Sequence, residues 1–204
     1  MVKDAYPDDD RDLVGRCQAG SEPAFEELVR KYQQVVFNLV HHNLGYRGDV
    51  EDVAQKIFVK VYFSLSKFDN NRPFFPWLYR IAVNQCYDEL RRARRHRLIT
   101  FTELSLEDGD AIEKLMNQPD RPAENPAEKK EMHALLLRLL EQLPEQQRMA
   151  IVLRDLEDVP YGRLAEILKC TEQAARLKVF RARGRLRNLM EKALRRQQRA
   201  RRRP

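Results

Sequence analysis

The sequence predicts an all-α protein with two small helical domains joined by a flexible acidic linker. The 204 residues include only seven glycines, and runs of Leu, Ala, Glu, Arg and Gln favour helices. Apolar residues recur at three- and four-residue steps in both halves, where strands would alternate. Between the halves, residues 103–131 hold three prolines and nine acids against four bases, a composition typical of a solvated spacer.

These composition changes place the boundaries. We assign the first domain to residues 10–98, the linker to 99–128 and the second domain to 129–194. Residues 195–204, RRQQRARRRP, lack apolar periodicity, and we expect a disordered basic tail there.

In the first domain, three helices are predicted. The first begins at Ser21, a suitable N-cap, with Pro23 in its first turn. Its apolar stripe comprises Phe25, Leu28, Val29, Tyr32, Val35, Val36 and Leu39. After a turn at residues 44–49, a second helix follows in residues 49–68, and a third starts near Phe75.

In the second domain, four helices are predicted, in MHALLLRLLEQL, EQQRMAIVLRDL, YGRLAEILKC and TEQAARLKVFRARGRLRNLMEKALRR. Pro144 stops the first of them and suits the first turn of the next. The short turn at Lys169 before an arginine-rich helix matches a helix-turn-helix, whose second helix lies in the major groove of DNA. A charged amphipathic surface helix is the alternative. On the last helix, the side that we expect to face the domain contains Leu177, Phe180, Gly184 and Leu189.

Charge is segregated along the chain. The net charge is +7, but residues 160–204 alone carry fifteen Lys/Arg against three acids. A basic end block of this kind indicates a phosphate-bearing partner. The segment RPFFPWLYRIAVNQCYDELRRARRHR (residues 72–97) combines four closely spaced aromatics with five arginines in its last seven residues, which indicates a partner with flat faces and negative charge.

Several classes of protein are disfavoured. No apolar run approaches the roughly 18 residues of a membrane span, and the acidic start is unlike a signal peptide, so we expect a cytoplasmic protein without membrane insertion. The three cysteines lie too far apart for a disulfide framework. We expect no metal, because Asp49, Glu51 and Asp52 lack i, i+4 spacing and the histidines form no ligand pattern, each being a surface or satisfied residue. Those histidines are His41, His42, His96 and His133.

Two stretches carry a resemblance to a known family. Residues 49–92 contain DxEDxxQ, WLYRIAxN and DxLRR, and residues 140–187 contain LPExxR and FRAR. In this order and spacing the chain resembles the extracytoplasmic-function (group IV) RNA polymerase sigma factors over nearly all of residues 10–190. The resemblance implies two helical domains, a sigma region 2 bundle and a sigma region 4 helix-turn-helix, with no catalytic activity and no cofactor.

The resemblance also implies roles for particular residues. The residues that would dock on core RNA polymerase are Asp49, Glu51, Asp52, Gln55 and Phe58. Those that would bind the melted minus-ten element are Asn70, Asn71, Arg72, Asn84, Asp88, Arg91, Arg92 and Arg95. Those that would bind the minus-thirty-five duplex are Arg176, Lys178, Phe180, Arg181 and Arg183. Trp77, Tyr79 and Ile81 are expected in the core.

The partners implied are core RNA polymerase, promoter DNA in duplex and single-stranded form, and an anti-sigma factor that binds between the domains. Lys169 stands where many members have Gly. If that turn requires a left-handed residue, Lys costs about 1–2 kcal/mol there.

Two other functions stay open at this stage. A stand-alone helix-turn-helix transcriptional regulator would bind duplex DNA without polymerase. An enzyme acting on DNA would need a nucleophile beside arginines, and Tyr87 near Arg91 is the single faint candidate.

Overall fold

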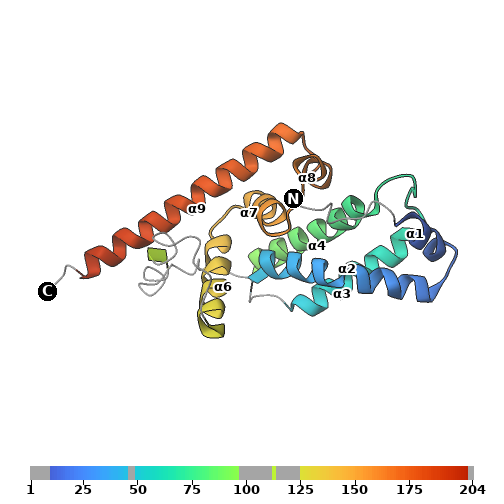
Figure 1. Ribbon diagram of the computed structural model, residues 1–204, viewed down its shortest axis with the longest axis horizontal. Helices are drawn as coiled ribbons and strands as arrows, with labels where there is room; N and C mark the ends of the chain where they lie inside the picture. The colour runs from blue at the N-terminus through green and yellow to red at the C-terminus, as the bar shows by residue number, and fades with distance from the viewer. Residues whose placement is uncertain (1–9, 46–48, 97–111, 114–124, 202–204) are drawn as a thin grey trace.

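The computed structural model describes residues 10–45, 49–96, 112–113 and 125–201 (Figure 1), and within these the regular elements are helical, as predicted. The elements of the first half are α1 (Arg11–Gln18), α2 (Glu22–Leu44), α3 (Val50–Leu65) and α4 (Phe74–His96). Those of the second half are α6 (Pro126–Glu141), α7 (Glu145–Ile151), the π-helical turn η2 (Val152–Leu156), α8 (Tyr161–Leu168) and α9 (Glu172–Arg201).

The predicted start of α2 is confirmed, and α6 begins at a cap that the sequence analysis did not predict, six residues before Met132. The Ser21 hydroxyl accepts a hydrogen bond from the Ala24 N–H at 3.4 Å, and Pro23 lies in the first turn of α2. Asn125 caps α6 in the same way, through a 2.8 Å bond from the Glu128 N–H. Such caps satisfy backbone donors that the helix itself leaves unpaired.

Helix α1 was not anticipated from the sequence, because its eight residues bury only Leu13 and Val14. It is held by the buried carboxylate of Asp10, which accepts hydrogen bonds from the Tyr32 hydroxyl and the Lys31 ammonium of α2. A short helix with so few apolar positions depends on these contacts with α2.

The aromatic residues at the start of α4 form part of the core. Phe74, Phe75 and Tyr79 are buried, while Trp77 is half-buried with its ring 4.7 Å from that of Phe68. The core position expected for Tyr79 and Trp77 is therefore confirmed. Burying such large side chains anchors the loop that precedes α4.

Helix α9 packs through a different face from the one expected. In its first turns the buried residues are Ala175, Val179 and Ala182, whereas Leu177 is 45% exposed and Phe180 is 74% exposed. The expectation that Leu177 and Phe180 face the domain is wrong. Small side chains let α9 lie close to α7 and α8, and their weak hydropathy hid the buried stripe in the sequence.

The end of α9 also differs from the expectation. The helix continues to Arg201, so the disorder expected from residue 195 onward is wrong as far as that residue, and residues 202–204 lie outside the described part. Leu189, expected to face the domain, is partly buried in a small second core. The buried members of this second core are Ile112, Leu135, Leu139 and Ala193. Ile112 belongs to the expected linker, most of which lies outside the described residues.

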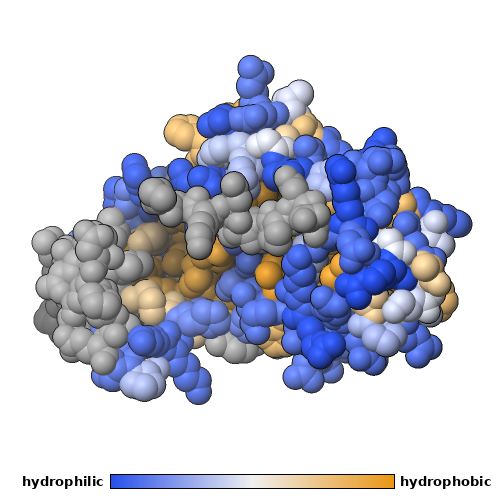
Figure 2. Space-filling model, turned by 45° about the vertical axis from the view of Figure 1, so that its right-hand side comes forward, coloured by the Kyte–Doolittle hydropathy of each residue, from blue (hydrophilic) through white to orange (hydrophobic). Residues whose placement is uncertain are grey.

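The two halves of the chain share one main core. It runs from Leu28 and Leu39 of α2 to Leu140, Leu153 and Leu164 of the second half. Helix α8 lies against α4, and α6 and η2 lie against α2 (Figure 1). The surface around this core is mainly hydrophilic on the face shown in Figure 2.

One buried guanidinium joins the halves. Arg148 of α7, which is only 8% exposed, donates from Nη1 to the Asn43 carbonyl at 2.7 Å and from Nη2 to the Glu141 carbonyl at 3.0 Å. The Leu143 carbonyl accepts a further, longer bond at 3.4 Å. The carbonyls at helix C-termini lack intrahelical donors and carry partial negative charge, so a fixed cation is well placed there.

Histidines gather at the same boundary. The ring of His41 stacks on that of His133 with centroids 5.2 Å apart and planes 6° apart, and His42 lies 5.9 Å and 6.0 Å from them. The Glu157 carboxylate lies 3.5 Å from His42 Nδ1. The sequence indicated only surface or satisfied histidines and did not reveal that these three meet. Within the described residues, no group of three or more His, Cys, Asp or Glu side chains could hold a metal ion. Burial, and then His133 and His42, lower the pKa of His41.

We expect Arg148→Met to lower the free energy of unfolding by about 2–4 kcal/mol, because it leaves buried carbonyls without donors. Arg163→Met, which removes a half-exposed partner 3.6 Å from Glu166, should cost less than about 1 kcal/mol. Urea unfolding of the full chain measures both. Equal effects of the two substitutions would contradict the joining role of Arg148.

Stability should also fall as the pH drops below the ordinary His pKa of 6.5, because the native state disfavours the charged form of His41. The unfolded chain then binds more protons than the native one, so acid favours unfolding until the native His41 is itself protonated. His133→Gln removes a stacked imidazole that helps to lower the pKa of His41, and it should reduce this dependence. Urea unfolding at pH 7.5 and pH 5.8 tests it, and an unchanged difference between the two pH values in the variant would disprove it.

Candidate polymerase and nucleic-acid interface

The acidic face predicted for polymerase docking forms the first turns of α3. Asp49 caps the helix by accepting a 3.1 Å bond from the Asp52 N–H, and Glu51, Asp52 and Gln55 are exposed. Phe58 is half-buried against the main core, so only part of its ring is accessible. Carboxylates at a helix N-terminus are stabilised by the helix dipole, which lets this negative surface form without a compensating ion.

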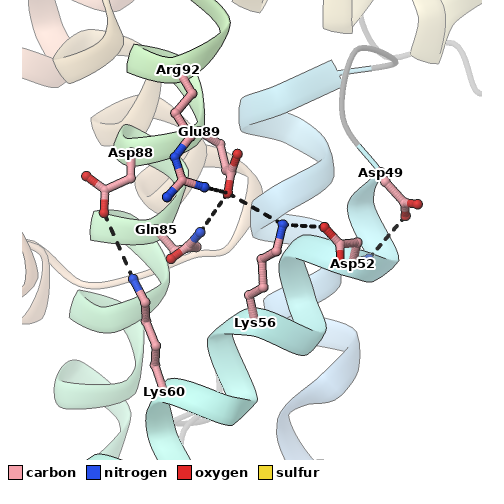
Figure 3. A network of polar contacts seen from close by, with 8 residues as sticks. All are labelled: Asp49, Asp52, Lys56, Lys60, Gln85, Asp88, Glu89 and Arg92. Carbon is pink, nitrogen blue, oxygen red and sulfur yellow. Dashed lines mark hydrogen bonds and ion pairs between the residues drawn. The ribbon is translucent and has the colours of Figure 1, made fainter.

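Lysines of α3 connect this face to α4 (Figure 3). The Lys56 ammonium donates a hydrogen bond to the Asp52 carboxylate and lies 4.0 Å from that of Glu89. The hydrogen bond that Asp52 accepts raises the pKa of Lys56. One turn further, Lys60 lies 4.0 Å from Asp88. The same Glu89 carboxylate accepts a 3.2 Å bond from Arg92. These ion pairs lie along the side of α3 that faces α4.

The loop before α4 is tied to α1. Asn70 Nδ2 donates to the Arg11 carbonyl at 2.9 Å, and Gln18 Nε2 donates to the carbonyls of Leu65 and Phe68 at 2.9 Å and 2.8 Å. Sequence reasoning missed Gln18, because its partners lie about fifty residues away. The loop is thus held from one side by α1 and from beneath by the aromatic core.

Two exposed residues of this loop are organised by Asp69. Its carboxylate accepts 3.1 Å bonds from the N–H and the side-chain amide of Asn71, and Arg72 lies 3.4 Å away. The bonds from Asn71 lower the pKa of Asp69. Asn71 and Arg72 are therefore presented to solvent in a defined geometry.

The predicted minus-ten residues of α4 share one face of the helix. Asn84, Asp88, Arg91 and Arg95 follow one another at four- and three-residue steps, with Arg92 alongside. Asn84, Arg91 and Arg92 are exposed, and Asp88 is half-buried with Arg91 at 3.7 Å. The side chain of Arg95 lies outside the described part. Exposed cations paired this loosely can exchange their carboxylate partners for phosphate.

Tyr87, the faint candidate for a catalytic nucleophile, is half-buried where α4 meets the second half. Burial first, and then Glu145 and other neighbours, raise the pKa of Tyr87 to about 12. Burial likewise raises the pKa of Cys86 to about 12. Both groups are thus held in their protonated, unreactive forms near neutral pH.

The helix-turn-helix places its turn on a strained residue. Lys169 has φ 50° and ψ 51°, the left-handed conformation that Gly adopts at low cost. The sequence expectation that Lys would be costly in such a turn therefore applies. Thr171 then accepts a 3.2 Å bond from the Ala174 N–H and begins α9.

The predicted minus-thirty-five residues fall into two groups. Phe180 and Arg181 project into solvent, and Lys178 is half-buried. Arg176 and Arg183 are held by acids instead. Arg176 binds Glu172 at 2.6 Å and stacks on the Tyr161 ring at 4.3 Å, and Arg183 binds Asp155 through two bonds of 2.6 Å and 2.9 Å. The acid partners were not anticipated, because they lie outside the recognition motif.

Comparison with known proteins agrees with this arrangement. The family model Sigma-70 region 2 matches residues 28–96, and Sigma-70, region 4 matches residues 133–186. The ECF RNA polymerase sigma-E factor of Escherichia coli strain K12 is 36% identical over 191 residues, covering 92% of this chain and 97% of that relative. The RNA polymerase sigma-H factor of Pseudomonas aeruginosa is 33% identical over 189 residues, covering 91% and 96%.

A solved structure supports the same assignment at the level of the whole chain. CnrH in complex with the cytosolic domain of CnrY superposes with a TM-score of 0.65 at 26% identity, covering 89% of this chain and 97% of that one. The region 2 model matches the first helical half of this chain, and the region 4 model matches the second. The chain belongs to the extracytoplasmic-function family of RNA polymerase sigma factors.

Proposed function

We propose that this sigma factor directs promoter-specific initiation through three surfaces of stated chemistry. The start of α3 docks on core RNA polymerase, the loop at residues 68–75 with α4 captures the melted minus-ten element, and the first turns of α9 read the minus-thirty-five duplex. Residues 10–98 and 129–194 are the corresponding domains, and residues 99–128 connect them. The observation that carries the proposal is the exposed polar loop held over a buried aromatic core and continued by the basic face of α4.

Docking through α3 is supported by its charge. Glu51 and Gln55 are exposed, and the Lys56 ammonium is paired with the carboxylates of Asp52 and Glu89. The acidic start of α3 therefore suits a basic groove on the polymerase. Phe58 adds a partly accessible apolar contact to this acidic face. The remaining apolar surface of α3 includes Val59 and Phe63, which are 48% and 73% exposed.

Strand capture is supported by the loop and α4 together. Unpaired bases need pockets with hydrogen-bonding groups, and Asn71, Arg72 and Asn84 supply exposed ones beside the cations of Arg91 and Arg92. The aromatic rings lie beneath the loop rather than on its surface, so they act by making the loop rigid. Unpairing costs a few kcal/mol, and binding energy of similar size drives it without nucleotide hydrolysis.

Duplex reading is assigned chiefly to Phe180 and Arg181. An Arg suits the two acceptors of guanine, and an exposed aromatic ring suits the thymine methyl group. Glu172 and Asp155 orient the guanidinium groups of Arg176 and Arg183, which favours phosphate contacts at the groove edge.

The factor itself catalyses no reaction, binds no cofactor and works in the bacterial cytoplasm, where RNA polymerase acts. Among the described residues, no helix is long and apolar enough to cross a membrane. CnrH was solved in complex with the cytosolic domain of CnrY. We infer that an anti-sigma partner likewise binds this chain and controls how the packed halves separate.

The proposal is tested by mixing the purified full chain with core RNA polymerase. We expect co-elution in gel filtration and run-off transcripts from a library of genomic fragments. A stand-alone regulator would bind duplex DNA and leave the polymerase unbound.

Promoters recovered in this way allow a test of strand capture. Arg91→Gln with Arg92→Gln should slow promoter opening about tenfold or more, measured by permanganate reactivity of unpaired thymines, because two phosphate contacts are lost. Lys129→Gln with Lys130→Gln removes equal charge from exposed positions on α6 and should leave opening unchanged. Co-elution with the polymerase should persist in both variants. Normal opening by the Arg91 and Arg92 variant would refute the minus-ten assignment.

A further inference from the structure

Helix α9 carries one continuous exposed row far beyond the helix-turn-helix. At four- and three-residue steps it comprises Leu177, Arg181, Gly184, Asn188, Lys192, Arg195 and Arg199, all exposed. This spacing keeps the residues on one side of an α-helix. The side that carries the recognition residues therefore continues without a turn or break toward the C-terminus.

The opposite side of the helix is anchored. Leu186, Leu189, Met190 and Leu194 pack around Ala193 in the second core. That core also contains Leu135 and Leu139 of α6 and the buried Ile112. The direction of α9 is thus fixed as far as Leu194, and its last turns extend away from the body of the protein (Figure 1).

The last turns of α9 carry almost only positive charge. Residues 187–201 contain six Lys/Arg and one acid, Glu191. The Glu191 carboxylate lies 3.9 Å from Arg195, in an exposed pair of the kind that contributes little to stability. Like charges concentrated on one rigid helix repel one another, so an anionic partner would relieve an existing cost.

The length of the row sets the geometry of binding. From Leu177 to Arg199 it spans about 33 Å at about 1.5 Å per residue, close to one turn of duplex DNA. The major groove winds around the duplex and is about 12 Å wide, so a straight helix stays within it for only a few turns. Once the first turns of α9 face base edges, the later ones cross the sugar-phosphate backbone.

We propose that residues 188–201, the C-terminal arm of α9, bind the phosphates of duplex DNA flanking the minus-thirty-five element. This inference rests on the proposed function, because the recognition turns must first occupy the groove. Lys192, Arg195 and Arg199 are the principal contacts, and they add affinity without reading sequence. Gly184, with no atom within 4 Å of a Cβ placed on it, allows the backbone to come close to the DNA between the two parts of the row.

Duplex DNA fits the arm better than other anionic partners. The exposed row of the arm offers no aromatic side chain on which single-stranded bases could stack. Its apolar side chains face the second core instead of forming the opposite face that a membrane-surface helix inserts into lipid. Continuity with the recognition residues supplies the positive reason.

The test compares holoenzymes made with the full chain. Lys192→Gln, Arg195→Gln and Arg199→Gln together should lower the slope of log Kd against log salt by about 2–3 on a recovered promoter, since each phosphate contact contributes about 0.9. Arg30→Gln, Lys129→Gln and Lys130→Gln together remove the same charge from exposed positions elsewhere and should not change the slope. Circular dichroism confirms that both variants stay helical.

The length of the DNA provides an independent measurement. Adding about ten base pairs of arbitrary sequence on each side of the minus-thirty-five element should tighten binding of the wild-type holoenzyme about tenfold and have little effect on the triple arm variant. The proposed role of the arm would be contradicted if the triple variant kept the wild-type salt slope. It would also be contradicted if flanking DNA tightened binding equally in the wild-type and variant holoenzymes. A triple variant that loses binding only to single-stranded RNA or to phosphatidylglycerol vesicles would contradict it as well. A chain that fails to join the polymerase would instead overturn the proposed function.

Discussion

The guanidinium of Arg148 donates hydrogen bonds to carbonyl groups of α2 and of the turn after α6, two segments about a hundred residues apart in sequence. Around it, residues from both halves of the chain merge into one main core. Burying a guanidinium is costly unless its carbonyl partners remain in place. The position of α7 and that of the end of α2 therefore depend on each other. Through α7, the same contact positions α9, which packs closely on it.

That arrangement has consequences for both candidate DNA surfaces. Helix α8, the first of the helix-turn-helix, lies against α4, whose basic face is assigned to the melted strand. The stacked imidazoles of His41 and His133 occupy the same boundary between α2 and α6. A packed boundary that contains a buried cation and stacked imidazoles is less tolerant of separation than an apolar one, because each polar group must find water or a new partner when it opens. Any partner that separates the halves must supply that free energy.

Helices α4 and α9 bury side chains of different size. In α4 the large aromatics are inside and support a polar loop, while in α9 small residues are inside and Phe180 is left in solvent. An exposed ring contributes little to folding, and in the proposed function Phe180 contacts the DNA. The acids Asp155 and Glu172 hold two arginines beside it, which reduces the freedom those side chains lose on binding.

Much of the fold and the site followed from short-range chemistry in the sequence. Ser21 caps α2 through its own neighbours, and Leu28, Tyr32, Val36 and Leu39 of the predicted stripe of α2 are buried. The family motifs contain the acidic start of α3 and Arg91 and Arg92 of α4, which lie at exposed positions of helices. These features depend on residues within a few turns of one another, so a linear pattern contains them.

Other features were decided by the tertiary structure alone. The buried stripe of α9 consists of alanines and a valine, which only close approach to α7 and α8 makes into a core. Gln18 holds a loop from about fifty residues away, and the histidine cluster joins positions about ninety residues apart. Helix α1 and the part of α9 around Ala193 have weak local signals and are stabilised by packing against α2 and α6. The sequence by itself thus determined the longer helical segments and where the charge lies. The short helix α1, the inner faces of the helices and their distant partners depend on contacts that have no local signature.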